Sequence, residues 1–556
     1  MKTVSTAEMA AIETEADAAG LTYAQMMQNA GEGVARIVDG MRLHTDQREV
    51  LGLVGPGNNG GDTLVALCNL AAAGWRTGAY LVNRKTDPLV ERLQQLGGTA
   101  LLALQDKNFA GLEGLLQTAR VVIDGVLGTG SKPPLRGAVS AVLEAVQRFL
   151  GGQPEAPYIV AVDCPSGTDC DTGEVAPQSL AADLTVTIAA AKRGLLKMPA
   201  FGLVGELQAV DIGLSPSLRA WPVPGTEMAQ RDEVAALLPA RPMDAHKGTF
   251  GTALIVAGSV NYTGAAWLAG KAAYRAGAGL VTLAVPGPLH AALAGHLPEA
   301  TWILLPDAGG VISREGAVVA MASFPGVDAV LVGPGIGTRQ TTQDFMTALL
   351  SAGPGPGKAG ASTGRRTRGR GRQAAHRLTM PPAVVDADGL RLLAGIKDWN
   401  KLLPPHSVLT PHPGEMSFLT SIPKDEIQRD RESVAQKFAR AWDHIVVLKG
   451  ALTVVASPDG RTTIIPIASA ALARAGTGDV LAGLIVGLRA QGLEAYEAAV
   501  AGAWIHGRAG LQAARAAGNT ASVLAGDVLA SIPEVMRELT IRTAAREADL
   551  ARNRPR

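Results

Sequence analysis

The sequence predicts two α/β domains in series, each built around a parallel β-sheet. Short apolar, β-branched runs precede glycine-rich turns in EVLGLVGPG at 49–57, RVVIDGVLGTG at 120–130 and YIVAVDCPSG at 158–167. Apolar strands that each lead into a turn and then a helical pattern are typical of a parallel sheet covered on both faces. The same alternation begins again with GTALIVAGS at 251–259, after a proline-rich break. We therefore expect one sheet on each side of that break.

The 556 residues exceed what one hydrophobic core usually organises. In the second half, the small-residue run TGAAWLAGKAAYRAGAG at 263–279 predicts a helix. Apolar runs predict further strands at 328–332, 383–386, 406–410 and 444–448. The boundaries that we expect are a first domain at 1–215, a linker at 216–240, a second domain at 241–540 and a polar tail at 541–556.

Charge and cysteine content argue against several classes of protein. The net charge of +1 provides no overall field for nucleic acid or an anionic membrane. Three cysteines, Cys68, Cys164 and Cys170, are too few for the disulfide framework of a secreted protein. The N-terminus carries glutamates where a signal peptide needs an apolar core, and no later run approaches ~20 uninterrupted apolar residues. We expect a cytoplasmic protein with neither a membrane nor a nucleic acid as partner.

One segment, GPGPGKAGASTGRRTRGRGRQAAHR at 353–377, does not fit the α/β pattern. It contains six arginines and one lysine, and no acidic residue occurs between Asp344 and Asp386. This composition predicts a disordered Gly/Arg-rich insert. The alternatives are an RNA-binding arm or a site for another anion, although the segment has no aromatic residue to stack on bases.

Polar side chains follow three predicted strands of the first domain. The turn GPGNNGGDT at 55–63 sets asparagines and an aspartate among glycines, which suits close contact with a sugar–phosphate or nucleotide. A loop rich in local Asx-turns is the alternative. Asp124, Asp163 and Ser166 follow the other two strands, and carboxylate, amide and hydroxyl oxygens together suit an alkali or alkaline-earth cation. Cys164 and Cys170 lack two further ligands at zinc spacing.

The motifs VGPGNNGGD, DGVLGTG and VDCPSGTDCDTG resemble the signature loops of the YjeF N-terminal domain, the NAD(P)HX epimerase family with a Rossmann-like fold. The resemblance covers roughly residues 1–215 and implies a potassium site at Asn59, Asp124 and Ser166. It also implies that Asp163 is catalytic and exchanges protons at the hydrated nicotinamide. A structural aspartate that caps the PSG turn is the alternative for Asp163. At Thr63 the sequence departs from the family, in which a further glycine is common.

The same resemblance implies which residues bind the damaged dinucleotide in the first domain. They are Asn58, Asn59, Gly60, Gly61, Asp62, Gly128, Thr129, Gly130, Ser131, Lys132, Pro133, Pro134 and Asp163.

Six motifs between 246 and 483 resemble the YjeF C-terminal domain, the NAD(P)HX dehydratase family with a ribokinase-like α/β fold. In order they are HKGTFGTALIVAGS, VGPGIG, VVDADGL, LTPHPGE, VVLKGALT and ARAGTGDVLAG. The approach to the last motif, IASAALARAGTGD at 467–479, lacks the asparagine–proline or asparagine–glycine pair, and the glycine at 475, that are common in relatives. Gly476, Gly478 and Asp479 are retained, so we expect an active site.

Asp479 poses a question, because a carboxylate at a helix start either caps the helix or acts beside a bound anion. The resemblance implies that the GTGD backbone forms an anion hole for the transferring phosphoryl group. Asp479 then accepts the proton of the attacked hydroxyl. ADP with Mg²⁺ is the implied phosphate donor. The residues implied for the nucleotide are Lys449, Gly450, Ala451, Leu452, Thr453, Gly476, Thr477 and Gly478, and those for the hydrated substrate are Ala265, Gly335, His412 and Asp479.

Two of these residues can also be explained without a functional role. Lys449 alone would often be a surface lysine at a strand end. His412 alone would often be a loop histidine with its hydrogen bonds satisfied.

The combined resemblance implies repair of hydrated NADH and NADPH. The first domain would interconvert the R and S hydrates, and the second would dehydrate the S form with ADP, giving AMP and phosphate. One alternative is a vitamin-precursor kinase, because GTGD is shared across the ribokinase-like superfamily. Another is an RNA- or nucleotide-binding module. The sequence does not distinguish ADP from ATP or NADH hydrate from NADPH hydrate, and a homo-oligomer is the expected assembly.

Overall fold

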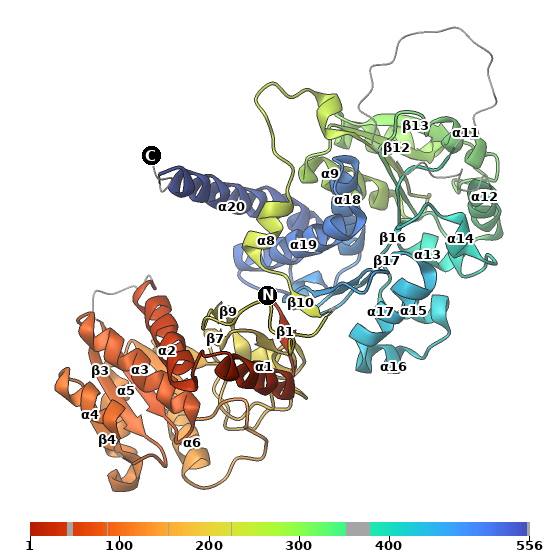
Figure 1. Cartoon of the computed structure of the whole chain (residues 1–556). Coiled ribbons are helices and arrows are strands. Elements are labelled where there is room, and N and C mark those ends of the chain that lie inside the picture. The colour runs from red at the N-terminus through yellow and green to blue at the C-terminus, as the bar shows by residue number, and fades with distance from the viewer. Residues whose placement is uncertain (42–47, 86, 154, 224, 352–378, 553–556) are drawn as a thin grey trace. The chain divides into compact units, whose positions relative to one another are not determined.

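The computed structural model describes residues 1–41, 48–85, 87–153, 155–223, 225–351 and 379–552, with the backbone alone from 541 onward. The insert expected at 353–377 lies outside the described residues. The chain divides into two compact units, Met1–Met228 and Ala229–Arg556, drawn in Figure 1. The segment 216–240, for which we expected a linker, contains a short strand, β10 (Thr226–Met228), and a helix, α8 (Arg231–Leu237).

A seven-stranded sheet forms the centre of the first unit, with the strand order β4-β3-β2-β5-β6-β7-β9 and every pair parallel. Its strands are β2 (Glu49–Val54), β3 (Arg76–Leu81), β4 (Thr99–Leu102), β5 (Val121–Gly125), β6 (Tyr158–Val162), β7 (Leu184–Ile188) and β9 (Glu206–Val210). Two short strands, β1 (Thr3–Val4) and β8 (Ala191–Lys192), pair separately. The parallel-sheet prediction is confirmed.

Helices cover both faces of this sheet. Along β2, Val50 and Val54 pack into the core beneath α2 and α3, whereas Leu51 and Leu53 pack into the core beneath α5 and α6. Alternate residues of one strand are therefore buried on opposite faces, which explains the continuous apolar run. The helices of the unit are α1 (Thr6–Ala18), α2 (Tyr23–Asp39), α3 (Asn58–Ala72), α4 (Pro88–Gln95), α5 (Ala110–Thr118), α6 (Gly137–Gly151) and α7 (Phe201–Val204).

Nine strands of the second unit form its sheet, in the order β19-β18-β17-β16-β15-β14-β11-β12-β13. They are β11 (Thr252–Val256), β12 (Leu280–Pro286), β13 (Thr301–Leu305), β14 (Ala329–Val332), β15 (Ala383–Val385), β16 (Val408–Leu409), β17 (Ile445–Leu448), β18 (Val454–Ala456) and β19 (Thr462–Ile464). The pairs from β17 to β13 are parallel, and the edge pairs β17–β18 and β18–β19 are antiparallel. Strand β16 is shorter than the predicted 406–410, because His406 adopts a left-handed backbone with φ 54°.

Helices again cover both faces, and one helix pair is packed especially closely. The helices α18 (Thr477–Ala490) and α9 (Thr263–Ala276) lie side by side (Figure 1) because Gly483 and Gly487 leave the space: a Cβ at these positions would lie 2.3 Å from Ala269 O and 2.6 Å from Ala273 O. The predicted helix at 263–279 ends early, at Ala276, where Gly277 has φ 107°. The longest helix, α20, continues through Arg552, into the range for which we expected a polar tail.

The helices of the second unit after α8 are α9 (Thr263–Ala276), α10 (Gly287–Leu293), α11 (Gly316–Ala322), α12 (Gln340–Leu350), α13 (Asp388–Leu393), α14 (Trp399–Leu402), α15 (Pro413–Thr420), α16 (Lys424–Arg429), α17 (Arg431–Trp442), α18 (Thr477–Ala490), α19 (Ala495–Ala517) and α20 (Ala525–Arg552). None of the helices in the described part of the chain has the length and hydropathy of a membrane-spanning segment.

Candidate active sites

In the first unit, three loops meet where β2, β5 and β6 end. The chain order of the sheet reverses between β2 and β5, and ligands of open parallel sheets bind beyond the strand ends at such a point. Asn59 joins the loops, since its Nδ2 donates to the carbonyl oxygens of Leu127 and Val162, each at 2.9 Å. These partners are 68 and 103 residues away in the chain. The alternative of a loop built from local Asx-turns is therefore wrong for Asn59.

The NNGGD motif forms the first turn of α3 rather than an irregular loop. The helix begins at Asn58 after the N-cap Gly57, so free backbone N–H groups lie at the strand ends. Gly60 is required for this geometry because a Cβ there would lie 2.0 Å from Gly55 O. Thr63, the departure from the family pattern, is fully buried and donates to Asn59 O at 2.8 Å. The threonine is thus accommodated within the helix.

Asp124 and Ser166 form a buried pair beside Asn59. Ser166 donates twice to the Asp124 carboxylate, from N to Oδ2 at 2.9 Å and from Oγ to Oδ1 at 2.6 Å, and Leu127 N donates to Ser166 Oγ at 2.9 Å. Burial raises the pKa of Asp124, partly offset by these hydrogen bonds. In the described part of the chain, no lysine, arginine or histidine forms an ion pair with this carboxylate.

The oxygen atoms around this pair fit a monovalent cation. One carboxylate, one hydroxyl, one amide side chain and two backbone carbonyls lie together, and such oxygens are hard ligands. The described residues contain no group of three or more His, Cys, Asp and Glu side chains that could hold a metal ion. A single carboxylate compensates one positive charge, which favours a monovalent over a divalent ion.

Asp163, directly after β6, adopts a left-handed backbone with φ 65° and is 7% exposed. Its Oδ1 accepts from Ile188 N at 3.0 Å and Thr187 Oγ1 at 3.3 Å, and it forms an ion pair with Lys192 Nζ. None of these partners belongs to the PSG turn, so the interpretation as a turn cap is not supported. Left-handed non-glycine residues concentrate at functional sites, where the surrounding structure holds them in place.

Two further carboxyl groups interact with this ion pair. Burial, and then the charges of Asp163 and Glu13, raise the pKa of Asp62 well above its ordinary value. Burial also raises the pKa of Glu13, with Lys192 opposing the shift. Lys192, with an exposed side-chain fraction of 1%, thus lies among three carboxyl groups. Neither Lys192 nor Glu13 was singled out from the sequence.

The predicted segment Gly128–Pro134 follows β5 without regular structure. A Cβ at Gly128 would lie 3.3 Å from the Asn59 side chain, which places this glycine at the meeting of the loops. Ser131 N donates to Gly128 O at 2.9 Å, and the buried Ser131 Oγ has no hydrogen-bond partner among the described residues. The segment ends in a cis peptide between Pro133 and Pro134.

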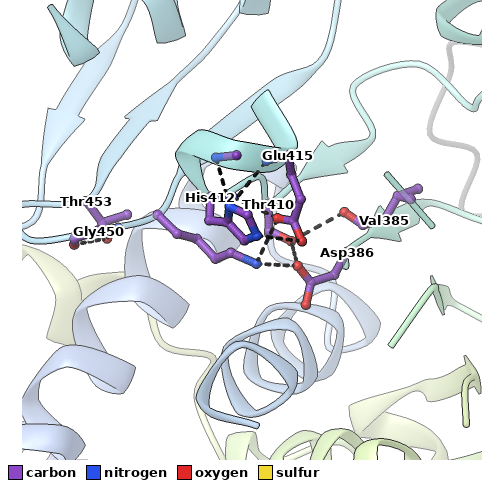
Figure 2. Close-up of polar contacts among 9 residues, drawn as sticks. Val385, Asp386, Thr410, His412, Glu415, Gly450 and Thr453 are labelled. Atoms are coloured by element: carbon purple, nitrogen blue, oxygen red, sulfur yellow. Dashed lines mark hydrogen bonds and ion pairs between the residues drawn. The ribbon is translucent and has the colours of Figure 1, made fainter. Parts of the chain in front are cut away.

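In the second unit, the strand ends of β15, β16 and β17 bring a lysine to two carboxylates, as Figure 2 shows. Asp386 is 1% exposed, and its Oδ1 accepts from Thr410 Oγ1 and Lys449 Nζ, each at 2.6 Å. Glu415 Oε2 lies 3.6 Å from the same ammonium. Burial alone would lower the pKa of Lys449, but the charges of Asp386 and Glu415 outweigh it and the pKa is raised. Lys449, with 17% of its side chain exposed, is therefore a largely buried cation in an ion pair, and its interpretation as a lysine that only faces water is not supported.

His412 is the N-cap of α15. Its Nδ1 accepts from Gly414 N at 2.9 Å and Glu415 N at 3.2 Å, while His412 N donates to Glu415 Oε2 at 2.8 Å. Burial lowers the pKa of His412, so the imidazole is neutral at neutral pH. Its Nε2 lies 3.4 Å from Glu415 Oε1 and is the ring nitrogen that remains for a ligand.

The GTGD motif forms the start of α18, with Gly476 as N-cap at φ 88° and no side-chain capping bond. Asp479 is in the first turn, so capping by Asp479 is not supported. Burial, followed by the charge of Asp386, raises the pKa of Asp479 to about 7. A Cβ at Gly478 would lie 3.5 Å from Lys449 Nζ and 3.9 Å from Asp386 Oδ2. The Lys449–Asp386 ion pair therefore borders the GTGD turn.

Two other predicted positions lie together after β11 and β14. A Cβ at Gly335, which has φ 63°, would lie 2.9 Å from Ala265 Cβ and 2.7 Å from Tyr262 Cβ. Ser259 Oγ donates to Gly335 O at 2.8 Å and fixes the loop. Tyr262, half-exposed beside these positions, was missed from the sequence.

The KGALT segment forms the loop between β17 and β18. Thr453 Oγ1 accepts from Gly450 N at 3.3 Å and donates to Gly450 O at 2.9 Å, which closes the loop (Figure 2). Leu452 has φ 56° and donates from N to Ile467 O at 3.0 Å, whereas Ala451 is exposed. Arg431 Nη2 donates to Leu448 O at 2.7 Å, beside this loop.

Comparison with known proteins gives the same division of the chain. The family described as YjeF-related protein N-terminus matches residues 23–194, and the family described as NAD(P)H-hydrate dehydratase matches 253–355 and 370–534. A protein named bifunctional NAD(P)H-hydrate repair enzyme Nnr from Moorella thermoacetica is 36% identical over 527 residues, 92% of each chain. The chain belongs to the family of bifunctional NAD(P)H-hydrate repair enzymes.

Other members and solved structures are similar in part or in full. The repair enzyme of Salinibacter ruber is 36% identical over 540 residues, 93% of each chain. The ADP/ATP-dependent NAD(P)H-hydrate dehydratase from Bacillus subtilis, crystallised with ATP and Mg²⁺, is 28% identical and covers 56% of this chain and 98% of its own, with a TM-score of 0.45. The yeast protein YNL200c is 23% identical and covers 40% of this chain and 98% of its own, with a TM-score of 0.33.

Several neighbours of these sites in this family member were not predicted. Asp386 and Glu415 lie inside the quoted motifs VVDADGL and LTPHPGE, and the position of Asp386 directly after β15 was an available signal. Thr410 lies in the second of these motifs and directly follows β16, but its contact with Asp386 depends on the pairing of β15 with β16. The roles of the predicted residues themselves stay predictions.

Proposed function

We propose that the first unit interconverts the R and S hydrates of NADH and NADPH, and that the second dehydrates the S form with a nucleoside diphosphate or triphosphate. Membership of the repair-enzyme family, at 36% identity over 92% of the chain, supports both activities. The observation that carries the chemistry is the position of Asp479, a carboxyl with a pKa raised to about 7 in the first turn of α18, beside the Lys449–Asp386 pair.

In the second unit, Asp479 takes the proton of the substrate hydroxyl. The hydroxyl oxygen attacks the terminal phosphorus of ADP, and AMP leaves. A base works best when its pKa lies near the ambient pH, because it is then both ionised and basic. The N–H groups at the start of α18 and the Lys449 ammonium stabilise charge on the transferring phosphoryl group. Phosphate then leaves with the electrons of the carbon–oxygen bond, a neighbouring carbon loses a proton, and the dihydronicotinamide is restored. Mg²⁺ would accompany the nucleotide.

In the first unit, Asp163 is the group that exchanges protons with the hydrated carbon and its hydroxyl. Three contacts hold Oδ1, from Lys192, Ile188 N and Thr187, which leaves Oδ2 as the atom to face substrate. The N-terminal turn of α3 and the loop Gly128–Pro134 would hold the dinucleotide. Potassium at Asn59, Asp124 and Ser166 would supply a fixed positive charge that joins the loops.

The test uses purified full-length protein and a mixture of R and S hydrates of NADH, with K⁺ and Mg²⁺, and with ADP, ATP or no nucleotide. We expect full recovery of dihydronicotinamide absorbance with a nucleotide, recovery of the S fraction alone in Asp163→Ala, and none in Asp479→Ala. Replacement of potassium chloride by choline chloride at equal ionic strength is expected to slow use of the R fraction only. Asp124→Asn should abolish that difference.

Other outcomes would favour the remaining hypotheses. No recovery with either nucleotide, in protein whose circular dichroism is that of a folded chain, would refute the dehydratase proposal. Phosphorylation of a vitamin-precursor alcohol by ATP under the same conditions would then favour the kinase alternative. Salt-sensitive retention of RNA at physiological ionic strength would favour a binding module.

A further inference from the structure

Within the described part of the chain, the Asp386 carboxylate accepts hydrogen bonds at one of its oxygens only. Its Oδ1 accepts from Thr410 and Lys449, whereas the buried Oδ2 has no hydrogen-bond partner among the described residues. Nearly all buried carboxylate oxygens are satisfied in folded proteins, so an exception at the strand ends of a candidate active site needs an explanation. Figure 2 shows the dashed contacts at one carboxylate oxygen of Asp386 and the other oxygen directed away from them.

The unpartnered oxygen points toward the GTGD turn. The position of a Cβ at Gly478 is 3.9 Å from Asp386 Oδ2 and 3.5 Å from Lys449 Nζ. Asp479 is the next residue, so both members of the ion pair lie close to the proposed base. No side chain at Gly478 screens the base from them.

The charged groups that face Asp479 come from several elements. Carboxyl groups approach from the end of β15, from α13 and from α15, and the ammonium approaches from the end of β17; they are Asp386, Asp388, Glu415 and Lys449. His412, the N-cap of α15, and His506 from α19 interact with the Lys449–Asp386 pair, and burial lowers the pKa of both, that of His506 to about 4. Both histidines are therefore neutral at neutral pH and contribute no charge.

We propose that Asp386 is a positioning residue of the second site: its carboxylate anchors the Lys449 ammonium beside the GTGD turn and, as a buried negative charge, makes Asp479 the stronger base. The inference rests on the proposed function, because it assigns a role in that same site. After burial, Asp386 is the largest contributor to the raised pKa of Asp479, and Lys449 is the largest opposing charge. The two members of one ion pair thus act on the base with opposite signs.

The opposite signs give a test that a merely structural role would not pass. Asp386→Asn removes a like charge and frees Lys449 to interact with the base, so both effects lower the pKa of Asp479. Lys449→Met removes the opposing charge and raises it. Plots of kcat/KM for the S hydrate against pH, at saturating ADP, report this group through their acid limb. We expect the apparent pKa of the acid limb to fall by about one pH unit in Asp386→Asn and to rise in Lys449→Met.

Asp398→Asn is the matched control, because Asp398 is an exposed aspartate of the same unit that pairs with Lys401. Its limb should coincide with that of the wild type. If Asp386→Asn fails to fold, the upward shift in Lys449→Met alone decides the matter. Equal losses at every pH, with limbs unmoved in both variants, would overturn the inference. A wild-type protein without activity on the hydrates would instead refute the proposed function, so the two failures are distinguishable.

Discussion

Replacement of Lys192 by methionine should lower the free energy of unfolding of the first unit, because it removes the positive member of a buried ion pair. The lysine donates to Asp163 Oδ1 and to Ile188 O at 2.9 Å, with Thr187 Oγ1 at 3.5 Å, and its side chain is 1% exposed. Methionine keeps an unbranched apolar stem, so little cavity forms. What changes is the charge: Asp163 stays buried with its hydrogen bonds from Ile188 and Thr187 but without its cation.

The expected magnitude follows from the burial of this pair. Removal of one partner from a buried ion pair typically costs about 3–5 kcal/mol, since the other charge is left uncompensated. Each 1.4 kcal/mol corresponds to a factor of ten, so amide hydrogen exchange limited by global opening of the unit should accelerate by about 10²- to 4 × 10³-fold. Hydrogen exchange followed by mass spectrometry on the full chain measures this for peptides from β6 to β8, separately from the second unit.

Two further variants make this measurement decisive. Lys197→Met, an exposed lysine that donates to Asp171 O, should change exchange by less than about threefold. The double variant Lys192→Met with Asp163→Asn should recover part of the loss, because the uncompensated charge is gone. Acceleration of less than about tenfold in Lys192→Met, indistinguishable from the Lys197 control, would refute the reasoning that this cation holds Asp163 in the fold.

Two other predictions concern the second unit. Because burial raises the pKa of Asp479 to about 7, the folded protein binds this proton more tightly than the unfolded chain, and stability falls as pH rises from about 4 to about 7. Asp479→Asn should remove that decline in stability, so the variant, though inactive, should have a higher Tm than the wild type at pH 8. An equal difference in Tm between variant and wild type at pH 4 and at pH 8 would contradict the argument. Gly450→Ala should weaken ADP binding and lower the free energy of unfolding by more than about 1 kcal/mol, because Gly450 has φ 152° and a Cβ would lie 2.7 Å from Arg431 Nη1. Calorimetric titration with ADP measures the loss of affinity. Gly526→Ala, where a Cβ meets nothing within 4 Å, is the control.

The local parts of both sites were predictable because they are contiguous in the chain. The GTGD turn, the NNGGD turn and the apolar runs that became β2, β5, β6 and β11 each specify their structure within about ten residues. Glycines mark the positions where backbone must approach backbone, as at Gly60. The family resemblance then assigned these turns to two sites. Strands without a glycine-rich turn after them, such as β7 and β9, carried no such signal and were missed.

The two-sheet architecture and the glycine-rich turns followed from the order of residues along the chain, and the family resemblance of those turns made Asp163 and Asp479 candidate catalytic residues. The charges that surround these two aspartates became known from the folded arrangement of the strands. Asp386, Thr410 and Lys449 come together because β15, β16 and β17 are neighbours, and Lys192 reaches Asp163 because β8 follows β7. The basicity of Asp479 likewise depends on burial and on charges up to 93 residues away in the chain, from Asp386 to Asp479. Electrostatic energy depends on distance and desolvation in space, and neither can be read from separation along the chain.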